Sequence, residues 1–420
     1  MTQGESSESL FFMNEATRQF IQQHRMDDVR QLALKGGGRL ADVDMPLALQ
    51  QIAGWQTARK KLPSWAEVEG LMYPPHLNME QCSSEETAIY KAKLSVFNAP
   101  CSMVNTLVDL TGGLGVDFSF MSRPFSKRVY VERNPELCEL ARHNFKCLGL
   151  EAEVVCAEAE DYLRAMAPVD VLYLDPARRD EHGSRTYGIE DCTPNVIELL
   201  PLLFEKSRRI LLKLSPMLDW HKAVCDLRKV SEVHIISVGN ECKELLLVLE
   251  NNPPEHLTIT CVNDDSIYRI VSLRETGSFI TRKQEFHYEK LRVCSGRTEA
   301  PLFLFEPNAS IMKAGFFMEV GDSFGINQLS PNSHLFVSDR EVVDFPGRRF
   351  RVDAVSSMNK QELKAALKGV ERANVAVRNF PLTAESLRKK LRLKDGGEVF
   401  IFGTTLFDGS HQLFICRKIG

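Results

Sequence analysis

Residues 109–117 read Asp-Leu-Thr-Gly-Gly-Leu-Gly-Val-Asp and continue the apolar stretch Val-Asn-Thr-Leu-Val that begins at residue 104. The pattern predicts a buried strand, a glycine-rich turn and then a helix. Gly112, Gly113 and Gly115 allow the chain to turn sharply and to bring backbone N–H groups close to a ligand. Because the spacing is neither Gly-x-Gly-x-x-Gly nor Gly-x-x-x-x-Gly-Lys-Ser/Thr, it argues against a pyrophosphate or P-loop site.

Acidic residues end or follow each of the first three predicted strands. Asp109 ends the first and is placed to accept hydrogen bonds from an amino-acid ammonium group. Glu132 ends the second, where a carboxylate can bind a ribose diol. Glu158 follows the third, where it can meet an adenine amino group. A ligand with an ammonium, ribose hydroxyls and adenine, but no phosphates, is S-adenosylmethionine.

We therefore predict an S-adenosylmethionine site at these strand ends. Its expected residues are Asp109, Thr111, Gly112, Gly113, Gly115, Asp117, Glu132, Arg133 and Glu158. The plainer interpretation is a glycine-rich turn in an α/β domain that binds no cofactor.

Residues 104–250 alternate between strand-like and helix-like stretches, which predicts a mostly parallel sheet with helices on both faces. The last two strand-like runs, 233–238 and 245–249, have a connection too short for a crossover helix and should pair antiparallel. Apolar residues three and four apart predict helices within residues 8–95. From residue 348 the order β-α-β-α-β-β predicts a small α+β domain. The fold class expected is α/β, with helices before the sheet and an α+β domain after it.

Over roughly residues 80–250 the chain resembles the class I S-adenosylmethionine-dependent methyltransferases, including their closing antiparallel hairpin. The resemblance implies a seven-stranded Rossmann-like sheet with the cofactor across the carboxyl ends of strands one to three. It also implies that Asp109 and the glycines cradle the methionine part and that Glu132 binds the ribose.

The fourth predicted strand ends in Asp175-Pro176, where class I enzymes face the methyl acceptor. This dipeptide is similar to the Asp-Pro-Pro-aromatic motif of amino-group methyltransferases, whose acid and neighbouring carbonyl hold an exocyclic amine. Here Ala177 and Arg178 replace the second proline and the aromatic. Asp175 and Pro176 are the expected catalytic residues, and a plain strand-ending turn is the alternative.

An Asp-Pro-Ala-Arg run also occurs in RNA uracil C5 methyltransferases, which need a cysteine nucleophile at the end of strand five. Here Ser215 and Pro216 occupy that region and no cysteine is present, so this mechanism is not expected. The expected acceptor contacts are Arg178, Arg179, Lys213 and Ser215. Arg178 and Arg179 are expected to pair either with phosphate or with the nearby carboxylates Asp180, Glu181 and Glu190.

Residues 80–88 resemble the Ser/Thr-x-Glu segment that helps close over the cofactor in RNA methyltransferases of the trimethylguanosine-cap type. The alternative interpretation is a helix start capped by Ser83 or Ser84.

The whole chain resembles a group of bacterial methyltransferases whose C-terminal domain is similar to the THUMP module of tRNA-modifying enzymes. This resemblance rests on the N-terminal helical segment and on the turn-rich stretches 306–310, 330–334 and 344–348. Residues 340–420 hold 16 Lys and Arg against nine Asp and Glu, although the whole chain has a formal net charge of −4. The resemblance implies an RNA partner, and a solvated basic surface is the alternative. Candidate phosphate contacts are Arg348, Arg349, Arg351, Arg388, Lys389, Lys390, Arg392 and Lys394.

The composition of the 420 residues, 44% hydrophobic and 26% charged, is that of a globular protein. No stretch approaches the ~18–20 apolar residues of a membrane span, and the first residues lack a signal-peptide pattern. Eleven scattered cysteines without a Cys-x-x-Cys pair argue against a disulfide framework or a metal site. We expect a cytoplasmic protein without membrane or metal, and its oligomeric state stays open.

The expected domains are a helical segment (1–95), a cofactor-binding methyltransferase domain (96–252), a strand-rich connecting region (253–335) and a basic THUMP-like α+β domain (336–420). The expected function is methyl transfer to a base nitrogen of RNA, tRNA or rRNA. One alternative is a methyltransferase of protein or small molecules. Another is a non-catalytic RNA-binding protein that keeps the fold, with or without the cofactor. The missing aromatic after Asp175-Pro176 leaves this alternative open.

Overall fold

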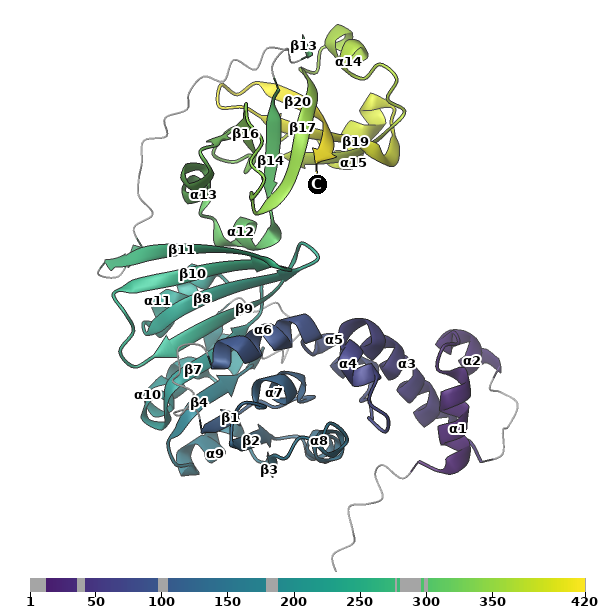
Figure 1. Ribbon diagram of the computed structural model, residues 1–420, viewed down its shortest axis with the longest axis vertical. Helices are drawn as coiled ribbons and strands as arrows, with labels where there is room; N and C mark the ends of the chain where they lie inside the picture. The colour runs from purple at the N-terminus through teal and green to yellow at the C-terminus, as the bar shows by residue number, and fades with distance from the viewer. Residues whose placement is uncertain are drawn as a thin grey trace, which may run out of the picture. The chain divides into compact units, whose positions relative to one another are not determined.

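The computed structural model describes residues 13–35, 42–96, 105–178, 188–275, 278–279, 296–297 and 301–419 (Figure 1). The chain divides into two compact units. The first holds residues 1–230 and 247–253, and the second holds residues 231–246 and 254–420.

Six helices precede the first strand in the described part of the chain. They are α1 (Glu15–His24), α2 (Val29–Lys35), α3 (Met45–Lys61), α4 (Pro63–Ala66), α5 (His76–Gln81) and α6 (Glu85–Ser95). Side-chain caps fix where they begin: Asn14 accepts from the Thr17 N–H at α1, and Ser84 accepts from the Thr87 N–H at α6. The predicted N-terminal helical segment is therefore confirmed from residue 13 on. The glycines at 36–38 lie outside the described residues.

The strands of the predicted sheet are β1 (Thr106–Asp109), β2 (Lys127–Glu132), β3 (Glu153–Cys156), β4 (Val169–Leu174), β7 (Ser207–Leu214), β8 (Val230–Val238) and β9 (Glu241–Glu250). They lie in the order β3-β2-β1-β4-β7-β9-β8. The pairs of β1 with β2 and β4, of β2 with β3 and of β4 with β7 are parallel. Gly239 and Asn240 join β8 to β9 with φ of 58° and 62°, the two positive values of a type I′ hairpin turn. The seven-stranded Rossmann-like sheet is confirmed.

Three more strands extend this sheet beyond β8. They are β10 (His256–Asn263), β11 (Ser266–Glu275) and β12 (Ser278–Phe279). β10 pairs parallel with β8, and β11 pairs antiparallel with β10. The added strands cover the unpaired N–H and C=O groups that β8 would otherwise expose at the sheet edge.

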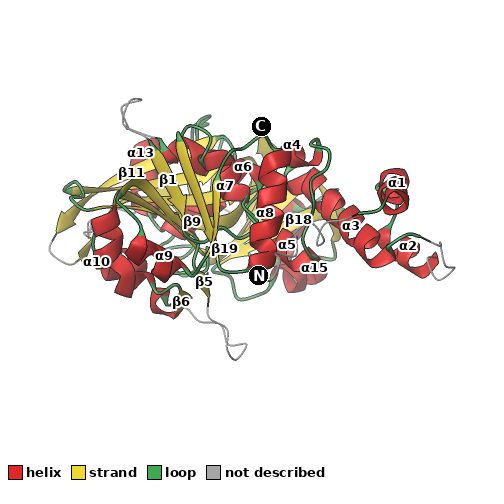
Figure 2. Cartoon of the chain, turned by 90° about the horizontal axis from the view of Figure 1, so that it is seen from below, coloured by secondary structure: helices red, strands yellow, loops and turns green. Residues whose placement is uncertain are grey.

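Helices cover both faces of the sheet: α7 (Val116–Met121), α8 (Pro135–Cys147), α9 (Ala159–Ala165), α10 (Val196–Lys206) and α11 (Trp220–Leu227). Figure 2 shows α6, α7 and α8 on one side of the strands and α9 and α10 on the other. The short strands β5 (Ala177–Arg178) and β6 (Cys192–Thr193) pair with each other outside the main sheet.

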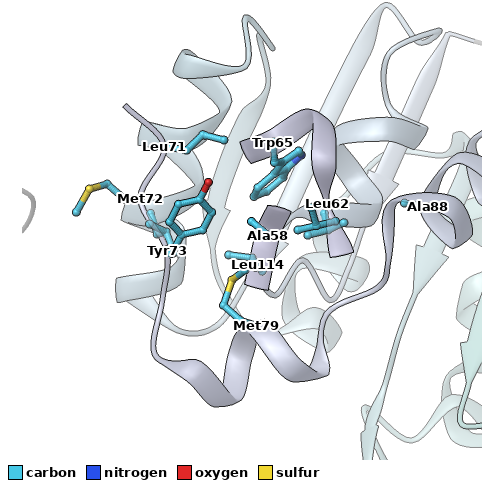
Figure 3. Packing of buried hydrophobic residues seen from close by; sticks show 11 residues of the cluster. Ala58, Leu62, Trp65, Leu71, Met72, Tyr73, Met79, Ala88 and Leu114 are labelled. Atoms are coloured by element: carbon cyan, nitrogen blue, oxygen red, sulfur yellow. The ribbon is translucent and has the colours of Figure 1, made fainter. Parts of the chain in front are cut away.

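The N-terminal helices pack directly on the glycine-rich turn. Leu114 of that turn belongs to one buried cluster with Leu62, Trp65 and Met79, as Figure 3 shows. Ala88 of α6 is a member of the same cluster. The burial of these apolar side chains fixes the turn from the N-terminal side.

The second unit contains a separate sheet. Its strands are β13 (Gly296–Arg297), β14 (Phe303–Pro307), β15 (Asn327–Gln328), β16 (Phe336–Ser338), β17 (Gly347–Ser356), β18 (Arg372–Arg378), β19 (Lys394–Thr405) and β20 (His411–Ile419). Its helices are α12 (Ala309–Ala314), α13 (Phe317–Phe324), α14 (Lys360–Ala366) and α15 (Ala384–Leu391). β18 and β19 pair parallel, with α15 in the connection between them, and β20 pairs antiparallel with both β17 and β19. The α+β domain predicted from residue 348 is confirmed.

The region expected to connect the two domains, residues 253–335, contributes strands to both sheets. β10 and β11 extend the first sheet, whereas β14 pairs with β17 in the second. The second sheet therefore begins before residue 336. Local sequence patterns predict that a segment is a strand, but they do not specify which distant strand it pairs with.

Candidate functional site

The glycine-rich turn sits tightly against β2 and α8. The Gly112 N–H donates to the Val131 carbonyl at 2.9 Å, and Gly113 and Gly115 have φ of 57° and 79°. A Cβ atom on Gly112 would lie 2.1 Å from the ring of Tyr130. The Tyr130 hydroxyl also donates to the Gly113 carbonyl. Glycine is therefore required at 112 for the close approach and at 113 and 115 for the left-handed backbone.

Glu132 holds the turn from the end of β2. One of its oxygens accepts from the Gly113 N–H at 2.9 Å and the other accepts from the Asn134 N–H at 2.8 Å. Each carboxylate oxygen has a further lone pair. Glu132 can therefore shape the turn and still accept a hydrogen bond from a ligand.

Asp109, at the end of β1, is buried with 1% of its surface exposed. Its Oδ1 accepts from the Thr111 N–H at 2.9 Å. Burial raises the pKa of Asp109 well above its ordinary value. The Thr111 hydrogen bond acts against this shift, and the neighbouring Asp117, Asp175 and Glu132 carboxylates add to it. A cationic ligand group would relieve this accumulation of negative charge.

Asp117 lies inside a buried network. Its Oδ2 accepts from the Ser83 hydroxyl at 2.8 Å and from the Tyr173 hydroxyl at 2.7 Å. Its Oδ1 lies 3.0 Å from Nζ of Lys91, a side chain with no exposed surface. Burial acts to raise the pKa of Asp117, but Lys91, Lys213 and the Tyr173 hydrogen bond bring that pKa below its ordinary value. Since both of its carboxylate oxygens contact protein groups, Asp117 stabilises the glycine-rich turn.

The acceptor edge lies where β4 and β7 end. Asp175 follows β4, and its N–H donates to the Thr111 hydroxyl at 2.6 Å, which joins the acceptor strand to the glycine-rich turn. Its Oδ2 lies 2.5 Å from Nζ of Lys213 in β7. Pro176 is buried, and Ser215 Oγ accepts from the Met217 N–H at 3.3 Å. The structure thus brings Thr111, Asp175 and Lys213 together.

The remaining predicted site residues are exposed or lie wholly or partly outside the described part of the chain. Glu158 is exposed at the start of α9 and makes no side-chain cap. Arg133 is exposed after β2, and its carbonyl accepts from Cys156 Sγ at 3.8 Å. Arg178 pairs through β5 with Cys192, but its side chain lies outside the described part of the chain, as does the whole of Arg179.

Ion pairs within the second unit already engage five of the eight basic residues proposed as phosphate contacts. Arg348 meets the buried Glu306, and Arg349, Arg351, Arg388 and Lys389 meet Glu341, Asp353, Asp395 and Glu385. Among the residues that the structure describes, no carboxylate lies within ion-pair distance of Lys390, Arg392 or Lys394. Of the eight candidates, these three, at the end of α15 and the start of β19, are therefore the ones whose charge is not compensated by an ion pair among the described residues.

Sequence reasoning missed Lys91 and Tyr173 as members of the site. It considered Ser83 as a helix cap or as part of a segment that closes over the cofactor, but the cap is Ser84 and Ser83 binds Asp117. Lys91 does have a local signal, because it lies three residues from both Ala88 and Leu94 on the buried face of α6. A lysine on an apolar helix face requires a buried counterion. The identity of that counterion, Asp117, follows only from the tertiary structure.

No group of three or more His, Cys, Asp or Glu side chains suited to a metal ion occurs within the described ranges. In the same ranges no helix has the length and apolar character needed to cross a membrane. The nine cysteines that the structure places are free thiols.

Comparison with known proteins gives three findings. Residues 347–418 match a family model described as THUMP domain-like, and residues 303–346 match one described as a ferredoxin-like domain. Two uncharacterised S-adenosylmethionine-dependent methyltransferases of Mycobacterium tuberculosis are 24% identical over 314 residues, 74% of this chain and 80% of theirs. A crystal structure from Porphyromonas gingivalis, described as that of a methyltransferase, matches with a TM-score of 0.79 and 31% identity, over 96% of this chain and 98% of that one.

The sheet, the glycine-rich turn and these relatives define the class of protein. The chain is an S-adenosylmethionine-dependent methyltransferase, and S-adenosylmethionine is its cofactor. It belongs to the bacterial group of class I enzymes that carries a THUMP-like domain at the C-terminus.

Proposed function

We propose that this enzyme acts in the cytoplasm and transfers the methyl group of S-adenosylmethionine to a base nitrogen of RNA, either tRNA or rRNA. The observation that carries the RNA assignment is the THUMP-like match over residues 347–418. That range contains Lys390, Arg392 and Lys394, three candidate phosphate contacts that have no ion pair among the described residues. The nitrogen assignment rests on Asp175 at the end of β4, in hydrogen-bond contact with the glycine-rich turn.

The cofactor fits the carboxylates at the ends of β1 to β3. Asp109 would accept from the ammonium, Glu132 from the ribose hydroxyls and Glu158 from the adenine amino group. Thr111 and the three glycines would line the methionine part, with Arg133 at the rim. An acidic edge without a lysine or arginine in the turn suits a cationic ligand that has no phosphates.

S-adenosylmethionine supplies an electrophilic methyl group on a sulfonium. The enzyme's task is then to hold the acceptor nitrogen in line with that methyl. Asp175 and a carbonyl near Pro176 would orient the amine, and positioning of this kind supplies most of the rate. A neutral amine needs no strong general base for this attack.

Substituting Asp175 with alanine should lower methyl transfer to RNA by about a hundredfold, because the amine loses its positioning contact. S-adenosylhomocysteine affinity should change little, since the Asp175 N–H that meets Thr111 is retained. Transfer is followed with labelled S-adenosylmethionine and RNA from cells that lack the gene. Asp161→Ala, an exposed carboxylate on α9, is the matched control. If Asp175→Ala transferred methyl groups as fast as the wild type, Asp175 would not be the residue that orients the acceptor amine.

Substituting Lys390, Arg392 and Lys394 together with glutamine should weaken RNA binding and flatten its dependence on salt. Each phosphate contact contributes about one unit to the slope of log affinity against log salt concentration. Fluorescence anisotropy with labelled tRNA at several salt concentrations measures both quantities. The control substitutes Arg351 and Lys389, which are ion-paired inside the domain. Equal loss in both variants would show that no particular cluster contacts RNA.

A further inference from the structure

The ion pair between Asp175 and Lys213 limits which chemical groups can accept the methyl group. This inference rests on the proposed function of the same site. We infer that the acceptor is the exocyclic amino group of a nucleobase. Asp175 accepts from that amino group while Lys213 donates to the ring nitrogen beside it. Lys213 is then the residue that determines specificity, because it excludes alkylammonium acceptors such as protein lysines.

The geometry places a donor and an acceptor side by side. β4 and β7 are parallel neighbours, with Leu172 opposite Ile210, so their carboxyl ends meet at the same edge of the sheet. Nζ of Lys213 lies 2.5 Å from Oδ2 of Asp175 at that edge. The Lys213 side chain is 13% exposed and that of Asp175 is 38% exposed. The carboxylate is therefore the more accessible partner, and the ammonium lies next to it at the same edge.

The charges around the pair disfavour a cationic acceptor. Lys213 compensates Asp175, just as Lys91 compensates Asp117. A lysine side chain of a protein substrate has a pKa of about 10.4 and is protonated at neutral pH, so it lacks the lone pair that methyl transfer needs. Its ammonium would also face the ammonium of Lys213.

An exocyclic nucleobase amine meets the pair with complementary groups. It is neutral, it carries N–H donors, and an acceptor nitrogen lies next to it in the ring of adenine, cytosine and guanine. Uracil has no amino group and offers no such match. In the transfer the nitrogen lone pair forms the N–C bond while the S–C electron pair returns to sulfur. The nitrogen then loses one proton to water, leaving S-adenosylhomocysteine and the methylated base.

The test compares Lys213→Met, which removes the donor, with Lys213→Arg, which keeps it. The enzyme is given labelled S-adenosylmethionine with RNA and, in a parallel reaction, with protein from cells that lack the gene. The labelled nucleosides and amino acids are identified by mass spectrometry after digestion. We expect the label on an exocyclic nitrogen of adenosine, cytidine or guanosine. We expect Lys213→Met to lower kcat/KM on the order of ten- to a hundredfold, as for loss of a base-edge contact. Lys213→Arg should recover part of this activity, and S-adenosylhomocysteine affinity should hold in both.

The matched control is Lys127→Met, an exposed lysine at the start of β2 and therefore at the opposite edge of the sheet. Should Lys213→Met fail to fold, Lys213→Leu makes the same comparison, because leucine also lacks a donor. A label on a ring nitrogen, ribose or carbon of RNA would overturn the inference while the enzyme remained an RNA methyltransferase. A label on protein amines with none in RNA would overturn both this inference and the proposed function in RNA methylation. Full activity of Lys213→Met would overturn the role of Lys213.

Discussion

Lys91→Met is expected to lower the free energy of unfolding by about 3–5 kcal/mol, because it leaves the carboxylate of Asp117 buried without its counterion. Lys91 has no exposed surface and lies 3.0 Å from that carboxylate and 3.0 Å from the Ser83 hydroxyl. Urea unfolding of the wild type and the variant measures the difference. The loss should be accompanied by weaker cofactor binding, because Asp117 lies in the first turn of α7, directly after the glycine-rich turn.

Lys93→Met is the matched control, since Lys93 lies on the exposed side of the same helix. Adding Asp117→Asn to Lys91→Met should restore part of the stability, because the neutral amide needs no counterion and its oxygen still accepts from Ser83 and Tyr173. If Lys91→Met proves no more destabilising than Lys93→Met, the buried pair does not stabilise the fold as described. A purely additive double variant would show that Lys91 and Asp117 are not coupled.

Asp109→Asn is expected to weaken S-adenosylhomocysteine binding by about ten- to a hundredfold. Asparagine keeps an oxygen for the Thr111 N–H, but it loses a charged hydrogen bond to the ligand ammonium, worth about 1.5–3 kcal/mol. Calorimetric titration measures the change, and Glu136→Ala, an exposed carboxylate in the first turn of α8, controls for the loss of one negative charge.

The same residue should make cofactor binding depend on pH. Burial raises the pKa of Asp109, so the free protein begins to protonate this group at a higher pH than an exposed carboxyl. Because the ligand ammonium binds the ionised form, affinity should fall as the pH falls through that raised pKa, and binding should release protons. Asp109→Asn should remove this part of the pH dependence. An identical pH profile in the wild type and the variant would show that Asp109 does not hold the ammonium.

The glycine-rich turn could be predicted from the sequence because every determinant is local. The strand, the glycines and Asp109 lie within a dozen residues, and Glu132 is the last residue of the next strand. The contacts that complete the site are not local. Lys213 meets Asp175 across two neighbouring strands, and Ser83 meets Asp117 over 34 residues. No periodicity within one segment encodes such pairs.

The basic tail shows a related limit of sequence reasoning. A count of lysines and arginines predicts a positive segment, but it does not show which cations already have partners. Arg348 and Arg378 both bind the buried Glu306, which comes from a strand more than 40 residues before Arg348. Only the folded arrangement separates these structural arginines from Lys390, Arg392 and Lys394.

The crystal structure of this enzyme with S-adenosylhomocysteine would test the central claim most directly. We expect the ligand ammonium on Asp109, the ribose hydroxyls on Glu132 and the sulfur facing Asp175 and Lys213. A ligand bound away from the carboxyl ends of β1 and β2, or one that leaves both carboxylates without contact, would contradict the assignment of the cofactor site and of the acceptor edge built upon it.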